Sequence, residues 1–308
     1  MVTSDTAAIL IDGGESRAFN SHIATELAAG PPLDVVLVTH WDRDHILGIR
    51  DLYLRGDLAA VRAPIVHFNH FIRTAEPRFG PSSVQDGSNL VALLRSRDVA
   101  IRDASAGESL TFDDLMLSVL GPSQDLLEKA ENEWNEHISA LGQADTGFMA
   151  AMAAVDEDDS PTNRASITTL VSEPDGPPLA LLTGDATGSD LLDQLVGAGL
   201  MPEGGSIHVP VIKVQHHGSE RNVSAEFVKR VTADHYILSA NGHHDNPDES
   251  ALELLIAAAA DTDAAIWFTS EGNSENQRKR MKRKRRQVET ASVRIGNPPN
   301  TPVEIELR

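Results

Sequence analysis

The 308-residue chain contains no cysteine, few aromatic residues and no long apolar run. Without cysteine the chain can form neither disulfides nor thiolate–metal bonds, so any metal site must use nitrogen and oxygen ligands. Aromatic residues make up only 4% of the chain while hydrophobic residues make up 41%, so the core must consist mainly of Leu, Val, Ile and Ala. No apolar run approaches the ~18 residues of a transmembrane helix. The first residues also lack the segments of a signal peptide, and we expect a cytoplasmic protein with no membrane partner.

Basic residues are scarce and unevenly placed. The chain has 26 Lys and Arg against 46 Asp and Glu, and eight of the basic residues lie in Arg278–Arg286. The rest of the chain therefore carries a formal charge of −28, which repels a polyanion at long range, whereas the basic run attracts one. No aromatic residue interleaves this run, so base stacking is not indicated. If the protein binds nucleic acid, we expect it to do so through Arg278–Arg286. The alternative is that this run is only a solvated loop or the exposed face of a short helix. The oligomeric state stays undetermined.

The densest set of polar side chains directly follows the apolar run Val35–Val38. It contains four candidate metal ligands within six residues, namely His40, Asp42, Asp44 and His45. A strand that ends in such a loop can aim several side chains at one point. Imidazole and carboxylate together suit Zn²⁺, Mn²⁺ or Fe²⁺, so the segment predicts a metal site.

Two further motifs follow apolar runs in the same way. Thr183–Asp185 comes after Leu179–Leu182, and Gln215–Ser219 comes after Val209–Val214. A Gly-Asp pair alone is weak evidence, because it is also common in turns. Three strand ends that each deliver His or Asp are nevertheless what a dinuclear hydrolase site requires.

With these motifs the chain resembles the metallo-β-lactamase-fold hydrolases. Within them it is most similar to a stand-alone soluble member of the ComEC-like group, which includes the hydrolase domains of DNA-uptake competence proteins. The resemblance implies an α/β (α+β) fold, the four-layer αββα sandwich. It covers about residues 9–270. The matching segments are Ile11–Gly14, His40–Gly48, Ser160–Ile167, Thr183–Asp185, His216–Ser219 and, more weakly, Ser239–Pro247.

Because the motifs are spread from Asp12 to His244, we predict one hydrolase domain over residues 1–270. Within it, a helical and acidic insertion is expected at about 124–160, and we interpret its patch Asp156–Asp159 as a solvated loop. Residues 271–300 are polar and basic and contain Asn-Pro-Pro, which indicates a flexible segment. Residues 301–308 alternate apolar and acidic side chains and predict a final edge strand.

The resemblance further implies a site for two divalent metal ions, Zn²⁺ or Mn²⁺. His40 and Asp42 would hold one ion, while Asp44, His45 and His217 would hold the other. Asp185 would bridge the two. A bridging hydroxide, formed because two cations lower the pKa of water, would attack phosphorus or a carbonyl carbon. Asp44 is thus both a ligand and a catalytic residue of the predicted site.

Two positions depart from the superfamily's most common pattern. Asp42 stands where most members have histidine, and this harder, anionic ligand favours Mn²⁺ or tolerance of it over strict Zn²⁺. Asn163 takes the place of a further histidine. Because an amide oxygen is a poor ligand, we expect Asn163 to hydrogen-bond substrate or metal-bound water. The first ion would then be weakly held, and a mononuclear resting state stays open.

The remaining polar residues of the motifs receive supporting roles. His217 is the expected ligand, with His216 donating either to a substrate phosphate or to a group that binds the metal, although the reverse assignment stays open. His244 matches a His-Pro feature of the family and would donate to a leaving oxygen, unless it is an ordinary loop histidine. Asp12 would orient a ligand histidine. Lys213 is interpreted as a solvent-facing lysine at a strand edge.

Three functions follow for the whole chain. The leading hypothesis is a metal-dependent phosphodiesterase or nuclease. The first alternative is a small-molecule hydrolase of the same fold that acts on a phosphoester, cyclic nucleotide, lactone or thioester, and the charge of −28 outside the basic run favours it. The second alternative is an inactive regulatory protein that docks through the basic run. The full set of candidate ligands speaks against this last function.

Overall fold

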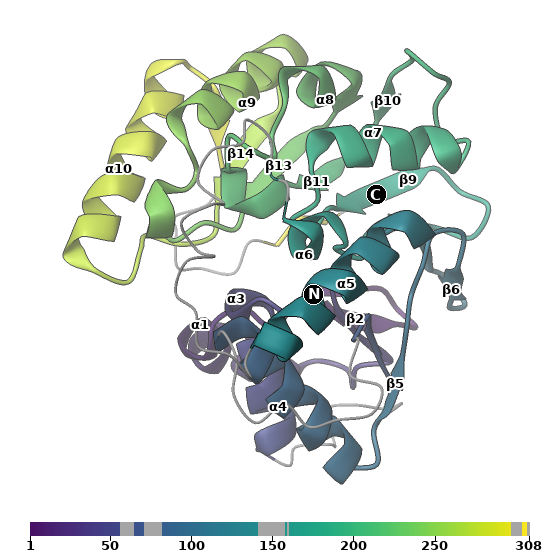
Figure 1. Ribbon diagram of the computed structural model, residues 1–308. Coiled ribbons are helices and arrows are strands. Elements are labelled where there is room, and N and C mark those ends of the chain that lie inside the picture. Colours follow the sequence, from purple (N-terminus) through teal and green to yellow (C-terminus); the bar gives the residue numbers. More distant parts are fainter. Residues whose placement is uncertain (56–64, 71–81, 141–157, 159, 297–303, 307–308) are drawn as a thin grey trace. The chain divides into compact units, whose positions relative to one another are not determined.

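The computed structural model describes residues 1–55, 65–70, 82–140, 158, 160–296 and 304–306. The chain forms two compact units (Figure 1). The first unit comprises Met1–Leu115, Pro122–Val155 and Asp159–Ile167. The second unit comprises Met116–Gly121, Asp156–Asp158 and Thr168–Arg308.

A five-stranded sheet with the order β1-β2-β3-β4-β5 lies at the centre of the first unit. The strands are β1 (Val2–Thr3), β2 (Ala8–Ile11), β3 (Val35–Val38), β4 (Ile65–Phe68) and β5 (Ala100–Arg102). Strand β1 is antiparallel to β2, and the other neighbours are parallel. Every residue of β3 is buried, as expected of a parallel strand covered on both faces. Because β2 and β3 run in parallel, Asp12 and Thr39, which follow them, emerge at one edge of the sheet.

Helices pack on this sheet and supply most of the first unit's core. They are α1 (Ser16–Ala18), the π-helix η1 (Phe19–Ile23), α2 (Ala24–Ala29), α3 (Arg43–Leu54), α4 (Ser82–Ser96), α5 (Gln124–Ala140) and α6 (Pro161–Arg164); the unit also contains the short strand β6 (Ser109–Thr111). Helix α5 lies within the expected insertion at 124–160, which itself stays a prediction, and residues 141–157 and 159 lie outside the described residues.

Two glycines let α3 approach the loop that follows β2. A Cβ added at Gly48 would lie 2.1 Å from the Gly13 carbonyl oxygen, and one added at Gly13 would lie 2.3 Å from the Ile49 nitrogen. Neither position therefore accommodates a side chain. The Gly13 N–H donates to the His45 carbonyl (2.8 Å), and the Gly48 N–H donates to the Gly14 carbonyl (2.9 Å). These contacts fix the first turns of α3 against the β2 loop.

The sheet of the second unit runs in the order β15-β14-β13-β11-β9-β8-β7. The strands are β7 (Met116–Gly121), β8 (Thr168–Ser172), β9 (Pro178–Leu182), β11 (Val211–Lys213), β13 (His235–Leu238), β14 (Ala265–Phe268) and β15 (Arg294–Ile295), and a separate parallel pair joins β10 (Ile207–His208) to β12 (Val231–Thr232). From β9 to β15 the neighbours are parallel, whereas β7, β8 and β9 are antiparallel. The loops after β9, β11 and β13 therefore meet at one edge, where polar side chains can converge.

Helices of the second unit complete its core. They are α7 (Gly188–Gly197), the 3₁₀ turns η4 (Gln215–Gly218) and η5 (His243–Asp245), α8 (Ala225–Arg230), α9 (Glu249–Thr262) and α10 (Glu275–Thr290). Figure 1 shows α7, α8, α9 and α10 following one another along this unit, and each contacts the next. None of the helices in the described part of the chain is both long and apolar enough to cross a bilayer.

Helix α10 corrects the prediction of a flexible segment at residues 271–300. The helix begins with a capping box, in which Ser274 and Gln277 satisfy each other's backbone N–H groups. Met281, Lys284 and Val288 then share one face at helical spacing and are buried. The buried face could not be recognised from composition, because the segment is rich in Lys and Arg and only two of the three buried residues are apolar. Of residues 301–308, only 304–306 are described, and they form no strand.

The α/β class predicted from the sequence is confirmed, with one predominantly parallel sheet in the first unit and one mixed sheet in the second. The assignment of residues 1–270 to a single domain stays a prediction, as does the layering of the two sheets.

Candidate metal centre

The first unit buries two histidines next to each other, and we call His40 and His45 the first-unit pair. His40 follows β3, and His45 lies in the first turn of α3. Both are buried, and their ring centroids are 4.1 Å apart. Asp42 is half-buried at the N-cap position of α3, and its Oδ2 lies 3.7 Å from His40 Nε2. Asp44, one residue before His45, is also half-buried. The structure thus places all four candidates of the first motif at the start of α3.

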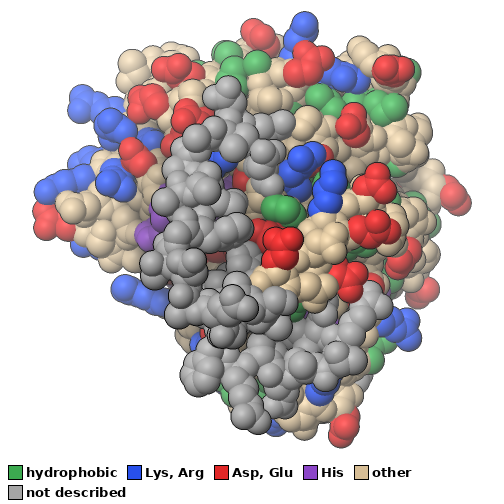
Figure 2. Space-filling model, viewed as in Figure 1, with side chains coloured by type: hydrophobic (Ala, Val, Ile, Leu, Met, Phe, Trp, Pro, Cys, Tyr) green, Lys and Arg blue, Asp and Glu red, His purple; other side chains and the backbone are tan. Residues whose placement is uncertain are grey.

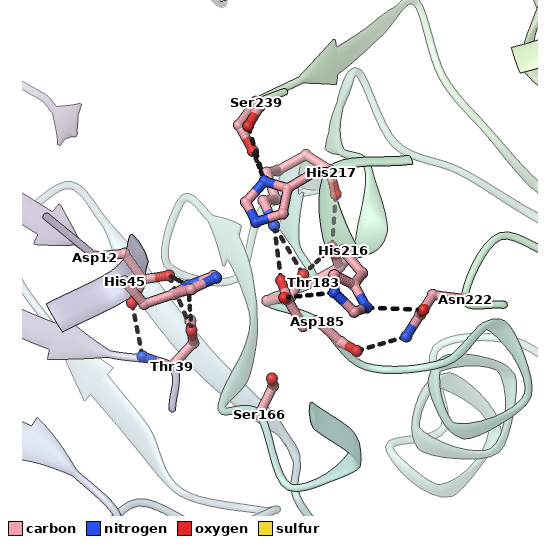
Figure 3. A network of polar contacts seen from close by, with 12 residues as sticks. Asp12, Thr39, His45, Ser166, Thr183, Asp185, His216, His217, Asn222 and Ser239 are labelled. Carbon is pink, nitrogen blue, oxygen red and sulfur yellow. Dashed lines mark hydrogen bonds and ion pairs between the residues drawn. The ribbon is translucent and has the colours of Figure 1, made fainter. Parts of the chain in front are cut away.

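Asp12 holds the His45 ring (Figure 3). Its Oδ2 lies 2.7 Å from His45 Nδ1, and its carboxylate also accepts from the Thr39 N–H and the Thr39 hydroxyl, both at 2.8 Å. Burial would raise the pKa of Asp12, but His45 and these hydrogen bonds hold it below its usual value. An ionised carboxylate at Nδ1 keeps the proton on that nitrogen and leaves the Nε2 lone pair to bind a metal. This is the contact that the orienting role predicted for Asp12 requires.

The Nδ1 of His40 faces hydroxyl groups, whereas the Nδ1 of His45 faces a carboxylate. Its Nδ1 lies 3.0 Å from Thr39 Oγ1 and 3.3 Å from Ser166 Oγ. Sequence reasoning included Ser166 in a matching segment but gave it no role. The same segment carries Asn163, which is buried on α6, and it is joined to Thr39 by the Ile167 N–H, which donates to the Thr39 carbonyl (2.9 Å). The role proposed for Asn163 toward substrate stays a prediction.

The second unit places Asp185 at the carboxyl end of β9, where its side chain is buried. Lys213 lies beside it on β11. The Lys213 Nζ donates to the Gly184 carbonyl (2.8 Å) and lies 3.5 Å from Asp185 Oδ1. The interpretation of Lys213 as a solvent-facing lysine is therefore wrong, since its side chain is only 19% exposed. Strands β9 and β11 pair in parallel with Lys213 opposite Leu182, which places Lys213 next to the loop that carries Asp185. The sequence alone does not show this pairing.

His216 and His217 form the second-unit pair in the turn η4 (Figure 3). His217 Nδ1 donates to the Ser239 carbonyl (2.8 Å) and lies 3.3 Å from Ser239 Oγ. Because a carbonyl can only accept, Nδ1 carries the proton and Nε2 carries the lone pair. His217 is therefore in the tautomer that a metal ligand needs, as its predicted role requires.

His216 has three polar partners. Its Nδ1 lies 2.9 Å from Asn222 Oδ1 and 3.1 Å from Asp158 Oδ2, and its Nε2 lies 3.6 Å from Asp185 Oδ2. Burial would lower the pKa of His216, but the carboxylates of Asp185 and Asp158 raise it to about 9. A protonated imidazole donates through both nitrogens and has no lone pair for a metal. The assignment of His216 as the donor and His217 as the ligand stays a prediction.

Asp158 and Asn222 were missed as site residues. The Asn222 amide donates to Asp158 Oδ2 (3.1 Å) and to the Asp185 carbonyl (2.8 Å), which joins three loops of the second unit. The interpretation of the acidic patch as a solvated loop is wrong for Asp158, whose side chain is 6% exposed. Its neighbours in that patch lie outside the described residues. The sequence held no signal for the contact, because Asp158 is 58 residues away from His216.

His244 is exposed in the turn η5, with its ring centroid 4.0 Å from that of His243. The loop that carries it contacts the second-unit pair, because the Asn246 amide donates to the His216 carbonyl (3.4 Å). The structure thus brings the His244 loop beside the His216–His217 turn. Donation from His244 to a leaving group stays a prediction.

Left-handed backbone occurs at some candidate residues of each unit, and also at Asp98, Asp175, Asp263 and Ser292 elsewhere in the described part of the chain. The candidate residues are Asp12 in the first unit and His216, His217, His244 and Asp245 in the second, with φ between 40° and 67°. Such conformations cost about 1–3 kcal/mol each and cluster at functional sites. Each unit by itself therefore combines strained backbone with oriented imidazole and carboxylate groups. This nitrogen and oxygen donor set fits a divalent metal ion.

Comparisons with known proteins agree with this chemistry. Residues 1–119, which include the first-unit pair, match the family model of the metallo-beta-lactamase superfamily. ComE operon protein 3 of Bacillus subtilis (strain 168) is 24% identical over 225 residues, which cover 72% of this chain and 22% of that protein. This chain thus spans less than a quarter of that relative's length. Among solved structures, the chain is similar to one described as "Crystal Structure of a New Diphosphatase from the PhnP Family", with 12% identity, a TM-score of 0.38, and coverage of 86% of this chain and 70% of that one. The resemblance drawn from the motifs is confirmed, and the family match supports a metal-dependent hydrolase.

Proposed function

Because residues 1–119 match the family model of the metallo-beta-lactamase superfamily, we propose that this protein is a metal-dependent phosphodiesterase, with nucleic acid as its substrate class. One observation carries the proposal. In each unit a histidine of the predicted ligand set has its Nδ1 fixed by an acceptor, Asp12 for His45 and the Ser239 carbonyl for His217. Histidines that bind metal ions commonly have such an acceptor at Nδ1, which orients the ring and leaves the lone pair on Nε2.

The proposed ligands are those that the motifs indicated. They are His40, Asp42, Asp44 and His45 in the first unit and Asp185 and His217 in the second. Mixed imidazole and carboxylate donors suit Zn²⁺ and Mn²⁺. A divalent ion held there would lower the pKa of water and neutralise charge on a phosphoryl oxygen. The cytoplasm remains the proposed compartment, because the chain contains no cysteine for disulfides.

The protein's own groups would bind and orient the ester. His216 stands as a hydrogen-bond donor to a phosphate oxygen, since Asp158 and Asn222 hold its Nδ1 and fix the direction of its ring. His244 would donate to the leaving oxygen from its exposed loop. Asn163 would hydrogen-bond substrate in the first unit. Each of these groups would hold the substrate in position, and positioning is a large part of catalysis in phosphoryl transfer.

The exposed face of α10 supports nucleic acid as the partner. A groove of about 610 Å³ lies along this helix and is bordered by Glu271, Arg278, Met281, Lys282, Arg285, Arg286 and Glu289. Arg278, Lys282 and Arg286 follow one another at intervals of four residues, which places them in one row about 6 Å apart along the helix. Among the described residues, no carboxylate oxygen lies within 4.0 Å of these three cations. Figure 2 shows Lys and Arg side chains gathered on the flank that α10 occupies in Figure 1.

A second candidate function, hydrolysis of a small phosphoester or cyclic nucleotide, is favoured by charge. The chain outside the basic run carries a formal charge of −28, which opposes a long polyanion but not a small ester.

The first test is hydrolysis by metal-stripped protein refilled with Mn²⁺ or Zn²⁺. The substrates are a chromogenic phosphodiester and labelled single- and double-stranded DNA. We expect metal-dependent cleavage that is lost in Asp44→Ala and kept in Asp193→Ala, a matched change at an exposed position of α7. Cleavage of the small diester alone would favour the second candidate. If metal-loaded protein cleaves none of the substrates, phosphodiester hydrolysis is excluded.

The second test concerns α10. The triple variant Arg278→Gln, Lys282→Gln and Arg286→Gln should weaken DNA binding and flatten its dependence on salt, by about 0.9 in log–log slope for each DNA phosphate that the variant no longer neutralises. Hydrolysis of the small diester should not change. Lys229→Gln on α8 is the control for removing an exposed cation from the same unit. An unchanged salt slope in the triple variant would remove α10 from nucleic-acid binding.

A further inference from the structure

The basic run on α10 contains one buried lysine. Lys284 is 1% exposed, although its basic neighbours in sequence, Arg283 and Arg285, are exposed and half-buried. It lies between Met281 and Val288 on the buried face of the helix, and these two are fully buried. Burying an ammonium group is unfavourable unless partners satisfy it. An apolar side chain at this position would pack the helix against the core at least as well. The role of Lys284 is therefore to be sought in the groups to which its ammonium is bonded.

Those partners belong to the loop at residues 242–247. The Lys284 ammonium donates to the Pro247 carbonyl, and its Nζ lies 3.8 Å from Asp245 Oδ1. One turn earlier on α10, Arg280 Nη1 donates to the Gly242 carbonyl (3.3 Å), and its Nε lies 3.7 Å from the same Asp245 oxygen. Helix α10 therefore holds this loop at both of its ends, with Lys284 as the buried contact.

The same loop supports the second-unit pair from the other side. The Asn246 amide donates to the His216 carbonyl (3.4 Å), and the Asp248 N–H donates to the Gly218 carbonyl (2.9 Å). Pro247 packs directly on Gly218, where an added Cβ would lie 2.5 Å from the proline Cβ. The residue whose carbonyl Lys284 holds is thus the one that packs against the end of the histidine turn.

Both segments in this chain of contacts are strained. His216 and His217 have φ of 40° and 55°, and His244 and Asp245 in the loop have φ of 50° and 67°. Backbone of this kind persists in non-glycine residues only where surrounding contacts over-determine it. The turn and the loop support each other, and the backbone of the loop also accepts hydrogen bonds from two charged side chains of α10, Arg280 and Lys284.

We propose that Lys284 is a positioning residue, which fixes the loop 242–247 from the buried face of α10 and through it holds the His216–His217 turn in its strained conformation. The importance of this role rests on the proposed function, because that turn carries the proposed ligand His217. The contacts themselves depend on no reaction, so they can be tested without one.

The test is hydrogen–deuterium exchange of the full chain, read peptide by peptide. Lys284→Met removes the charge and keeps a long apolar side chain on the buried face. Exchange in residues 215–219 and 242–248 should become about tenfold faster, while α10 itself keeps its protection. Lys282→Met, an exposed position on the same helix, is the control and should change neither segment. Unchanged exchange in both segments, or faster exchange confined to α10, would show that Lys284 only anchors the helix and would overturn the proposal.

Two further variants keep the question decidable. Lys284→Arg retains a cation with several donors and should restore most of the protection in both segments. If the methionine variant does not fold, Lys284→Gln, with a shorter neutral donor, replaces it. Wild-type exchange at 215–219 in that variant would equally refute the role.

Kinetics separate this proposal from the proposed function. If the wild-type protein hydrolyses a phosphodiester, Lys284→Met should lower kcat about tenfold and change KM less than about twofold, because the variant disturbs the reacting groups rather than substrate binding. If the wild-type protein hydrolyses none, the proposed function fails, and the exchange experiment still decides the role of Lys284.

Discussion

The two histidine pairs offer the same ligand chemistry but rest on different support. In the first unit, His45 belongs to a regular helix, and a side chain, Asp12, orients its ring. In the second unit, His217 lies in a left-handed turn, and a backbone carbonyl, that of Ser239, orients its ring. Both arrangements place an acceptor at Nδ1, so two different structural solutions orient the ring in the same way.

This difference shows where each pair is vulnerable. A helical histidine is stable in its backbone, but it loses its orientation when a single carboxylate is replaced. A histidine oriented by a carbonyl cannot lose that partner through substitution, yet its strained turn depends on the residues around it. We therefore expect the first-unit pair to be sensitive to its hydrogen-bond partner and the second-unit pair to be sensitive to its surroundings.

The largest effect is expected from Asp185→Ala in the second unit. The change removes a proposed ligand and also leaves His216 and Lys213 without the carboxylate that both face. Activity on the chromogenic diester should fall at least about 100-fold, and the bound metal measured by mass spectrometry should fall with it. Asp193→Ala is the matched control. A variant with full metal content and wild-type rate would refute the role of Asp185.

Replacing the partners of the oriented histidines tests the comparison directly. Asp12→Asn keeps the size of the side chain but removes its charge, and metal affinity should fall about 10- to 100-fold. Ser239→Ala removes only a hydroxyl 3.3 Å from His217 Nδ1 and leaves the carbonyl at 2.8 Å, so affinity should change less than about twofold. Titration with Mn²⁺ or Zn²⁺ against a chelating dye measures both. Equal losses in the two variants would contradict the distinction between side-chain and backbone support.

A smaller effect is expected at Asp42, the half-buried carboxylate beside His40. Asp42→His replaces a hard oxygen ligand with imidazole, so the ratio of Zn²⁺ to Mn²⁺ affinity should rise at least about threefold. Competition between the two ions in the same dye assay measures the ratio. An unchanged ratio would show that Asp42 contributes nothing to metal preference.

The smallest effect concerns stability against acid. Because His45 and the hydrogen bonds of Thr39 lower the pKa of Asp12 despite its burial, the ionised carboxylate stabilises the fold above the unfolded pKa of about 3.9. That contribution should disappear as the pH falls through the lower folded pKa. The stability advantage of the wild type over Asp12→Asn, measured by urea unfolding, should therefore shrink below about pH 4. A constant difference from pH 7 to pH 3 would mean that Asp12 is not an ionised partner of His45.

The sequence predicted the strand ends and their polar loops well. Apolar runs located β3, β9 and β11, and each is followed by the expected motif. These features are local, because a buried strand and the polar motif that follows it lie within about ten residues of sequence. The orienting role of Asp12 was proposed from its place between an apolar run and Gly13-Gly14, but its contact with His45 depends on the parallel pairing of β2 and β3.

The sequence failed where a contact joins distant segments or where composition misleads. Asp158 reads as part of a solvated acidic patch, yet it is buried against His216. Lys213 reads as a surface lysine, yet it lies beside Asp185. The segment that became α10 reads as flexible because its charge hides a buried face of Met281, Lys284 and Val288. In each case the residue is buried by contacts with another element of the fold, so no local sequence pattern predicts that burial.

The sequence by itself therefore determined which candidate donor groups this protein has. Nitrogen and oxygen ligands without thiolate, placed directly after buried strands, are fixed by residue type and order. The tertiary structure decided which nitrogen of each histidine is available, which charges are buried, and which lysine turns inward. These depend on partners brought together by strand pairing and helix packing over tens of residues, and directional hydrogen bonds form only once that packing exists.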